Sequence, residues 1–127
     1  MARILCIDDH TYSLSSTIKA LRHEGHTVVT AGEPLPALQA ISDGDVDVVL
    51  LDCHCHSIDI RSNLVAAIRI LRPDIPVVMT SAYCGLPCQK LREADACIQK
   101  GDTAALGRTI QTILCASKYG LCRSVAA

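Results

Sequence analysis

The chain has 127 residues, 50% of them hydrophobic, and a formal net charge of −1. This predicts one domain with a packed core, built mainly from Leu, Ile, Val, Ala and Cys because Trp and Phe are absent. The small net charge and scattered basic residues argue against direct nucleic acid binding, and no apolar stretch approaches the ~20 residues that span a bilayer, so we expect no membrane insertion.

The amino-terminal segment does not have the pattern of an export signal. Asp8 and Asp9 interrupt its apolar run after roughly five residues. We therefore expect a cytoplasmic protein whose eight cysteines remain thiols.

Five short apolar runs, rich in Val and Ile, alternate with segments of helical periodicity. Consecutive apolar positions in the middle runs are typical of strands that are buried on both faces of a sheet. The predicted strands are Arg3–Ile7, Thr27–Ala31, Asp47–Leu51, Pro76–Thr80 and Ala96–Gln99.

Apolar residues at helical spacing predict a helix after each strand. Gly25 ends the first helix, Pro34 lies in the first turn of the second, and Pro73 follows the third. The fourth is short, roughly Cys88–Ala94, and the fifth ends at Gly120. The periodic positions are Leu14, Ile18 and Leu21 in the first helix, Leu64, Ile68 and Leu71 in the third, and Leu106, Ile110 and Leu114 in the last.

The alternation of strands and helices implies βαβ crossovers and a parallel sheet. The predicted fold class is α/β, a doubly wound five-stranded parallel sheet with five helices in three layers. We expect residues 1–118 to form the domain and residues 119–127 to form a flexible tail. In such folds the functional site lies beyond the carboxyl ends of the strands.

Polar side chains end four of the predicted strands. Carboxylates that converge there repel one another, and a hard divalent cation such as Mg²⁺ relieves the repulsion. An ionised carboxylate can attack phosphorus to form an aspartyl phosphate, whose oxygens need a cation, a lysine and a hydroxyl donor nearby. The residues are Asp8 and Asp9 after the first strand, Asp52 after the third, Thr80 and Ser81 at the fourth, and Lys100 after the fifth.

Each of these residues also has an ordinary interpretation. Asp8 or Asp9 could cap the following helix, Asp52 could be a turn residue, Ser81 a cap and Lys100 a solvated charge. The coincidence of these residue types at four strand ends favours the chemical interpretation.

Four segments, "ILCIDDH", "DVVLLD", "PVVMTSAY" and "ACIQKGD", resemble in this order the motifs of the receiver domain of bacterial two-component response regulators. The resemblance covers about residues 2–118. It implies a flavodoxin-like sandwich with strand order 2-1-3-4-5. It also implies a stand-alone regulatory phosphoacceptor that supports its own phosphorylation and dephosphorylation, rather than an enzyme.

The resemblance also implies a role for each site residue. Asp52 would be the phosphoacceptor, Ser81 the switch hydroxyl and Lys100 the lysine that contacts the phosphoryl group. Mg²⁺ would be the cofactor, with Mn²⁺ as a possible substitute. The implied metal ligands are Asp9, Asp52, the backbone carbonyl of His54 and, mainly through water, Asp8.

A histidine kinase or a histidine phosphotransfer protein would be the phosphoryl donor, and the signal would pass to a protein target that the sequence does not identify. Phosphorylation would draw Ser81 inward and change the face formed by the predicted fourth helix, the fifth strand and the fifth helix. The resemblance is also compatible with a homodimer.

The sequence departs from the family pattern at four positions. His56 and Ser57 stand where Pro and then Gly are usual, and Gly101 stands where Pro usually follows the lysine. Cys97 replaces the usual aromatic switch residue, and we expect Tyr83 to take over its role. All residues of the chemical site are therefore expected to be present, whereas the residue that transmits the change of state differs from the usual aromatic.

The run of Cys and His at residues 53–56 leaves three interpretations open. With Cys84 and Cys88 it could form a tetrahedral Zn²⁺ site, it could contain a redox-sensing thiol, or it could be a partly buried Cys53 beside solvated histidines. The spacing is not that of usual zinc pairs, which favours the last. The alternative function is a metal- or thiol-based sensor on a degenerate receiver fold. A hydrolase of the aspartyl-phosphate type is disfavoured, because those enzymes carry Asp-x-Asp and position 54 is His.

Overall fold

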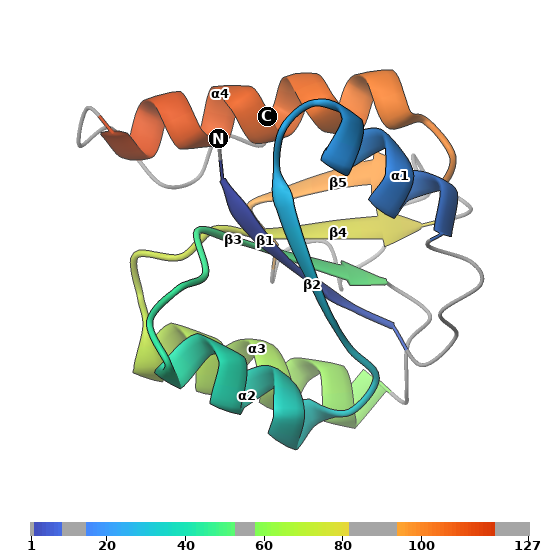
Figure 1. The fold of residues 1–127 in the computed structure, drawn as a ribbon. Coiled ribbons are helices and arrows are strands. Elements are labelled where there is room, and N and C mark those ends of the chain that lie inside the picture. The colour runs from blue at the N-terminus through green and yellow to red at the C-terminus, as the bar shows by residue number, and fades with distance from the viewer. Residues whose placement is uncertain (1, 9–14, 53–57, 82–93, 119–127) are drawn as a thin grey trace.

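The computed structural model describes residues 2–8, 15–52, 58–81 and 94–118 (Figure 1). The strands are β1 (Arg3–Ile7), β2 (Thr27–Ala31), β3 (Val48–Asp52), β4 (Val77–Ser81) and β5 (Ala96–Gln99). The helices are α1 (Ser15–His23), α2 (Pro34–Ser42), α3 (Ile58–Leu71) and α4 (Thr103–Lys118). Strands and helices alternate from β1 to β4 and again from β5 to the last helix, as the periodicity predicts.

The five strands form one parallel sheet in the order β2-β1-β3-β4-β5. Helices α1 and α4 cover one face of the sheet, and α2 and α3 cover the other (Figure 1). The predicted doubly wound α/β fold and its strand order are therefore confirmed. Within the described ranges, no helix is both long enough and apolar enough to cross a membrane.

Two predicted strands are displaced by one residue. β3 and β4 each begin and end one residue later than the apolar runs suggested, so that Asp52 and Ser81 belong to the strands themselves. Pro76 has no N–H and therefore cannot donate a hydrogen bond to the neighbouring strand. Its carbonyl still accepts a hydrogen bond from the Val49 N–H.

Some helix predictions fall outside the described residues. These are the short helix predicted over about Cys88–Ala94, of which only the last residue is described, the first periodic position of α1 at Leu14, and the predicted tail at residues 119–127. The four helices seen in the described ranges therefore do not test the predicted number of five.

The core consists of two clusters, one on each face of the sheet. Because successive side chains in a strand point to opposite faces, Cys6, Leu50 and Val78 pack towards α1 and α4, whereas Leu51 and Met79 pack towards α2 and α3. The three central strands are buried on both sides, which explains why their sequences are continuously apolar.

One apolar periodic position of α3 lies outside the core. Leu71 is 45% exposed, although its spacing from Leu64 and Ile68 is helical. It is the last residue of α3, and the buried Ile75 of the following turn joins this end of the core instead. Val65 completes the buried stripe of the helix.

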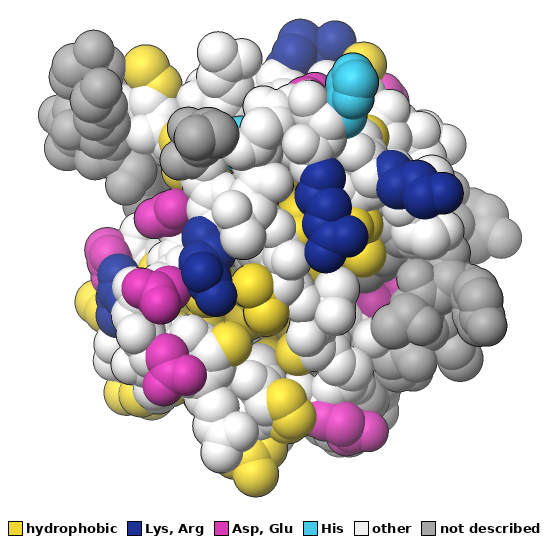
Figure 2. All heavy atoms as spheres, viewed as in Figure 1, with side chains coloured by type: hydrophobic (Ala, Val, Ile, Leu, Met, Phe, Trp, Pro, Cys, Tyr) yellow, Lys and Arg dark blue, Asp and Glu magenta, His cyan; other side chains and the backbone are white. Residues whose placement is uncertain are grey.

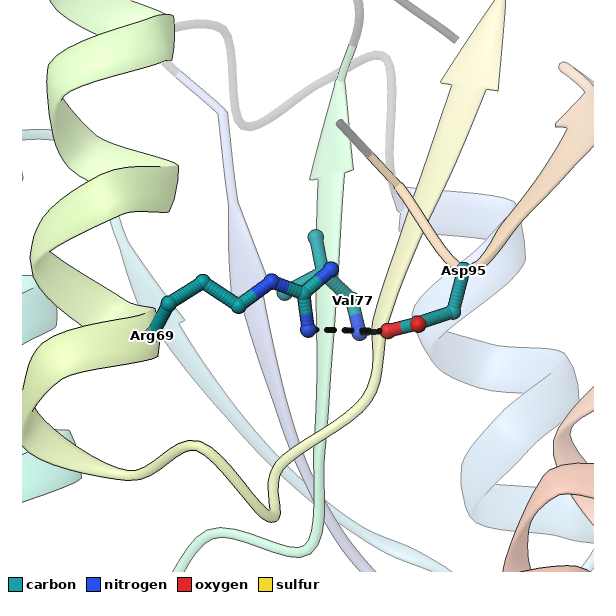
Figure 3. A network of polar contacts seen from close by, with 3 residues as sticks. All are labelled: Arg69, Val77 and Asp95. Carbon is teal, nitrogen blue, oxygen red and sulfur yellow. Dashed lines mark hydrogen bonds and ion pairs between the residues drawn. The ribbon is translucent and has the colours of Figure 1, made fainter. Parts of the chain in front are cut away.

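A buried ion pair ties α3 to the start of β5 (Figure 3). Asp95 is 4% exposed, and its Oδ2 accepts hydrogen bonds from Arg69 Nη1 at 3.1 Å and from the Val77 N–H at 2.8 Å. The Asp95 N–H in turn donates to the Val77 carbonyl at 2.8 Å. These bonds fix where β5 begins against β4, and hence where Lys100 emerges at its other end.

We expect Asp95→Ala to lower the free energy of unfolding by about 2–3 kcal/mol, because it leaves a buried N–H and a partly buried guanidinium without their acceptor. Asp95→Asn keeps an acceptor oxygen and should cost less. Arg72→Gln is the matched control, since it breaks the solvent-exposed ion pair with Asp74 and should lower the stability much less. Urea unfolding measures all three, and equal losses in Asp95→Ala and Arg72→Gln would contradict this role.

Candidate functional site

Asp8 and Asp52 lie next to each other at the carboxyl edge of the sheet. β1 and β3 are neighbours in which Ile7 pairs with Leu51, so the next residue of each strand is also level. The Asp8 N–H donates to the carbonyl of Ala31 at 3.1 Å and so prolongs the β1–β2 ladder by one residue. Adjacent strands are about 4.8 Å apart, which brings the two aspartates together as predicted.

Both carboxylates are buried. Asp8 and Asp52 are each 3% exposed. Asp8 lies two residues after Cys6 and Asp52 lies two residues after Leu50, and both Cys6 and Leu50 face α1 and α4. Two carboxylates on the same face of adjacent strands repel, and their burial reduces the screening of this repulsion by solvent. The site therefore needs positive charge.

Lys100 supplies part of that charge. Its Nζ donates to Asp52 Oδ2 at 2.9 Å, and the Asp52 side chain is only 4% exposed. The lysine follows β5 directly, so the predicted convergence of Asp52 and Lys100 from separate strand ends is present in the structure. Of the described residues named here, one ammonium stands against two carboxylates, which gives this set a net negative charge.

Gly101 explains one departure from the family pattern. Its φ is 93°, a backbone conformation that suits glycine and that proline cannot adopt. The Asp102 N–H closes the turn on the Gln99 carbonyl at 3.1 Å, and Asp102 Oδ1 accepts a hydrogen bond from the Ala105 N–H in the first turn of α4. A left-handed turn thus replaces the usual Lys-Pro connection.

The residual negative charge and the oxygen donors fit a hard divalent cation. Mg²⁺ prefers a few carboxylates together with waters and phosphate oxygens. Asp8 and Asp52 provide such carboxylates, whereas the other predicted ligands, Asp9 and His54, lie outside the described residues. The oxygen donors among the described residues suit a hard cation such as Mg²⁺ better than Zn²⁺.

β4 brings two hydroxyl residues to the same edge. Thr80 pairs with Asp52 across the sheet, and Ser81 is the last residue of the strand. Thr80 is 3% exposed, and its Oγ1 has no hydrogen-bond partner among the described residues. The sequence places both residues at the end of this strand, but the family resemblance assigns a role, that of the switch hydroxyl, only to Ser81.

The cysteine predictions are tested in part. Cys6 is buried, and burial raises the pKa of its thiol to about 12, with Arg22 lowering it and Asp8 raising it to smaller extents. Cys6 is thus a core residue whose burial disfavours the thiolate. Cys97 is partly buried on β5.

The other residues of the predicted switch and of the Cys- and His-based site lie outside the described residues. They are Tyr83, Cys53, His54, Cys55, His56, Cys84 and Cys88. In the part of the chain that the structure describes, no group of three or more Cys, His, Asp or Glu side chains has the arrangement of a metal site.

A groove of about 1080 Å³ lies at the opposite edge of the sheet. Its lining includes Glu24, Asp47, Arg72, Arg108 and Cys115, several of which precede strands rather than follow them. It contains none of the described candidate residues and is therefore not the site of the chemistry proposed from the sequence.

The surface agrees with the small net charge. On the face over α1, β2 and α2, Lys and Arg side chains are interspersed with Asp and Glu (Figure 2).

Comparisons with known proteins agree on one family. A family model described as the response regulator receiver domain matches residues 4–106. The transcriptional regulatory protein TcrA of Mycobacterium tuberculosis is 36% identical over 80 residues, which are 63% of this chain. The chain covers only 31% of the length of TcrA.

Solved structures give the same result for the fold. A CheY-like receiver domain protein from Methanospirillum hungatei JF-1 superposes with a TM-score of 0.81 and 26% identity, covering 94% of this chain and 98% of that one. The response regulator TrrA from Thermotoga maritima, solved in complex with Mg²⁺ and BeF, superposes with a TM-score of 0.75 and 24% identity. The superposition covers 88% of this chain and 98% of the TrrA chain.

Proposed function

Because the chain belongs to the response regulator receiver domain family, we propose that it is the phosphoacceptor of a two-component system or phosphorelay. Asp52 takes a phosphoryl group from a phosphohistidine donor, and the protein acts as a regulatory switch rather than as an enzyme. The observation that carries this proposal is the buried Asp52 carboxylate with Lys100 Nζ at 2.9 Å and Asp8 on the adjacent strand.

The transfer needs only positioning and electrostatic stabilisation from the protein. A carboxylate oxygen of Asp52 attacks phosphorus, the bond between phosphorus and the donor nitrogen breaks, and its electron pair stays with the imidazole. Lys100 is within reach to hold a phosphoryl oxygen, since its ammonium already contacts Oδ2 of the attacking carboxylate. Burial of Asp52 limits access of water to the product.

Asp8, Asp9 and Asp52, with the backbone carbonyl of His54, would hold Mg²⁺. The bound cation would supply positive charge against the carboxylates and the phosphoryl oxygens. The solved complex of TrrA with Mg²⁺ and BeF supports this choice, as does the excess of buried carboxylate over ammonium charge at this edge.

The phosphoryl donor would be a histidine kinase or a histidine phosphotransfer protein. The output would pass through the face that includes β5 and α4, because Lys100 joins the site to the turn between these two elements. TcrA, as a transcriptional regulatory protein, carries further chain beyond the matched part. The comparisons and the described residues give no support to the alternative of a metal- or thiol-based sensor.

Dependence on the divalent cation tests this proposal. With acetyl phosphate as donor, intact mass should reveal one added phosphoryl group in Mg²⁺, almost none in excess EDTA, and recovery when Mg²⁺ is restored, because uncompensated carboxylates repel the anionic donor. Asp9→Ala should raise the Mg²⁺ concentration needed for half-maximal labelling more than Asp8→Ala does. Asp45→Asn, an exposed charge change, is the control and should leave this concentration unchanged. Full labelling in EDTA would contradict the proposal.

A further inference from the structure

The hydroxyl of Thr80 is a buried polar atom near the carboxyl end of β4. Its Oγ1 has no hydrogen-bond partner among the described residues, and the residue is 3% exposed. Buried polar atoms in folded proteins are nearly always hydrogen-bonded, and an unpaired hydroxyl destabilises the fold relative to a side chain of the same shape without one. Valine would fill the same space at this position, so the hydroxyl calls for a functional reason.

The position of Thr80 supplies such a reason. It pairs in register with Asp52 on β3 and with Ile98 on β5. Register partners in adjacent parallel strands have side chains on the same face, about 4.8 Å apart along the sheet. Val78 and Leu50, two residues earlier on the same strands, belong to the α1/α4 face, which places the Thr80 and Asp52 side chains on that face too.

The ion pair of the site crosses the strand that carries Thr80. Lys100 follows β5, Asp52 ends β3, and β4 lies between them in the sheet. The 2.9 Å contact between Lys100 Nζ and Asp52 Oδ2 must therefore span β4 at its carboxyl end. Thr80 is the residue of β4 that is level with Asp52, on the strand that separates the two members of the ion pair.

We propose that Thr80 is a further residue of the phosphorylation site, whose hydroxyl donates a hydrogen bond to the aspartyl phosphate formed on Asp52. The proposal rests on the proposed function. Phosphorylation adds oxygen acceptors at the end of β3, and a hydroxyl on the neighbouring strand can donate to one of them beside Lys100. Thr80 is distinct from Ser81, the hydroxyl to which the family resemblance gives a role.

Thr80 forms no covalent bond in this step. The new bond to phosphorus uses a lone pair of Asp52, and the leaving group takes the electron pair of the bond that breaks. The Thr80 hydroxyl keeps its proton and directs it at an oxygen whose negative charge grows during transfer. Among the described residues it thus has no partner at rest, and it gains one in the phosphorylated state.

Two substitutions separate this role from packing. Thr80→Val keeps the shape and removes the hydroxyl, so labelling by acetyl phosphate should be about tenfold slower, while the midpoint of urea unfolding stays equal or rises. Thr80→Ser keeps the hydroxyl and removes a buried methyl, so labelling should stay within about twofold of wild type while the unfolding midpoint falls. A packing role alone would not move rate and stability in opposite directions.

Met79→Leu is the matched control, a substitution of similar volume on the same strand that faces the opposite layer, and it should slow labelling little. Wild-type labelling rates in Thr80→Val would overturn the inference, as would slowing of the same size in Met79→Leu. A Thr80→Val protein less stable than wild type would also overturn it, because the hydroxyl would then already be paired at rest. Labelling that persists in Asp52→Asn would instead overturn the proposed function.

Discussion

Asp52→Asn is expected to reduce phosphorylation by acetyl phosphate to below detection. The amide has nearly the same shape as the carboxylate but lacks an ionised oxygen that can attack phosphorus. No described carboxylate is placed to replace it: Asp8 is also buried at the edge, but the contact with Lys100 is made by Asp52. The effect should therefore be a loss of the reaction rather than a change in its rate.

The measurement is intact mass after incubation with acetyl phosphate and Mg²⁺. Asp45→Asn is the control, since it removes one carboxylate from an exposed position before β3 and should label as wild type does. Asp52→Asn should also show a cooperative urea transition, which would confirm that a folded protein has lost the reaction. Undiminished labelling of Asp52→Asn would mean that another residue is the acceptor.

Lys100→Met should slow phosphorylation about a hundredfold, the usual effect of removing one preorganised donor from a site where charge develops. The side chain that crosses β4 to reach Asp52 would keep its approximate length and lose its ammonium. Lys100→Arg retains the positive charge and should recover part of the rate, although its larger planar group cannot occupy the same place.

The control for this prediction is Lys19→Met, which removes an exposed ammonium from α1 and changes the net charge by the same amount. Initial labelling rates under saturating Mg²⁺ separate the two variants. If Lys100→Met and Lys19→Met label equally fast, the 2.9 Å contact with Asp52 has no part in the transfer.

The layout of the fold could be predicted because its signal is local. Short runs such as residues 48–51 are apolar at every position, and this pattern follows directly from burial on both faces of a parallel sheet. The polar residue that ends such a run must then lie at the carboxyl edge, which is how Asp8, Asp52 and Lys100 could be brought together before any coordinates. Boundaries were less accurate: one residue was misplaced at each end of β3 and β4.

The parts that could not be predicted depend on contacts between distant segments. Asp95 has the sequence context of a loop residue, and its importance comes from Arg69, 26 positions away, and from the Val77 N–H. The role of Thr80 could be inferred only from the strand register, which pairs it with Asp52, and from the lack of a hydrogen-bond partner for its hydroxyl among the described residues. The periodicity of α3 likewise could not indicate that the helix ends at Leu71, where the sheet no longer covers the side chain.

Chemical trapping of the modified residue tests the central claim most directly. Borohydride reduces an aspartyl phosphate to homoserine, so reduction of the labelled wild-type protein, followed by peptide mass spectrometry, identifies the acceptor. We predict homoserine at position 52, formed only after incubation with acetyl phosphate and Mg²⁺. Homoserine at another acidic position, or labelled protein in which Asp52 is unchanged, would contradict the assignment of Asp52 as the phosphoacceptor.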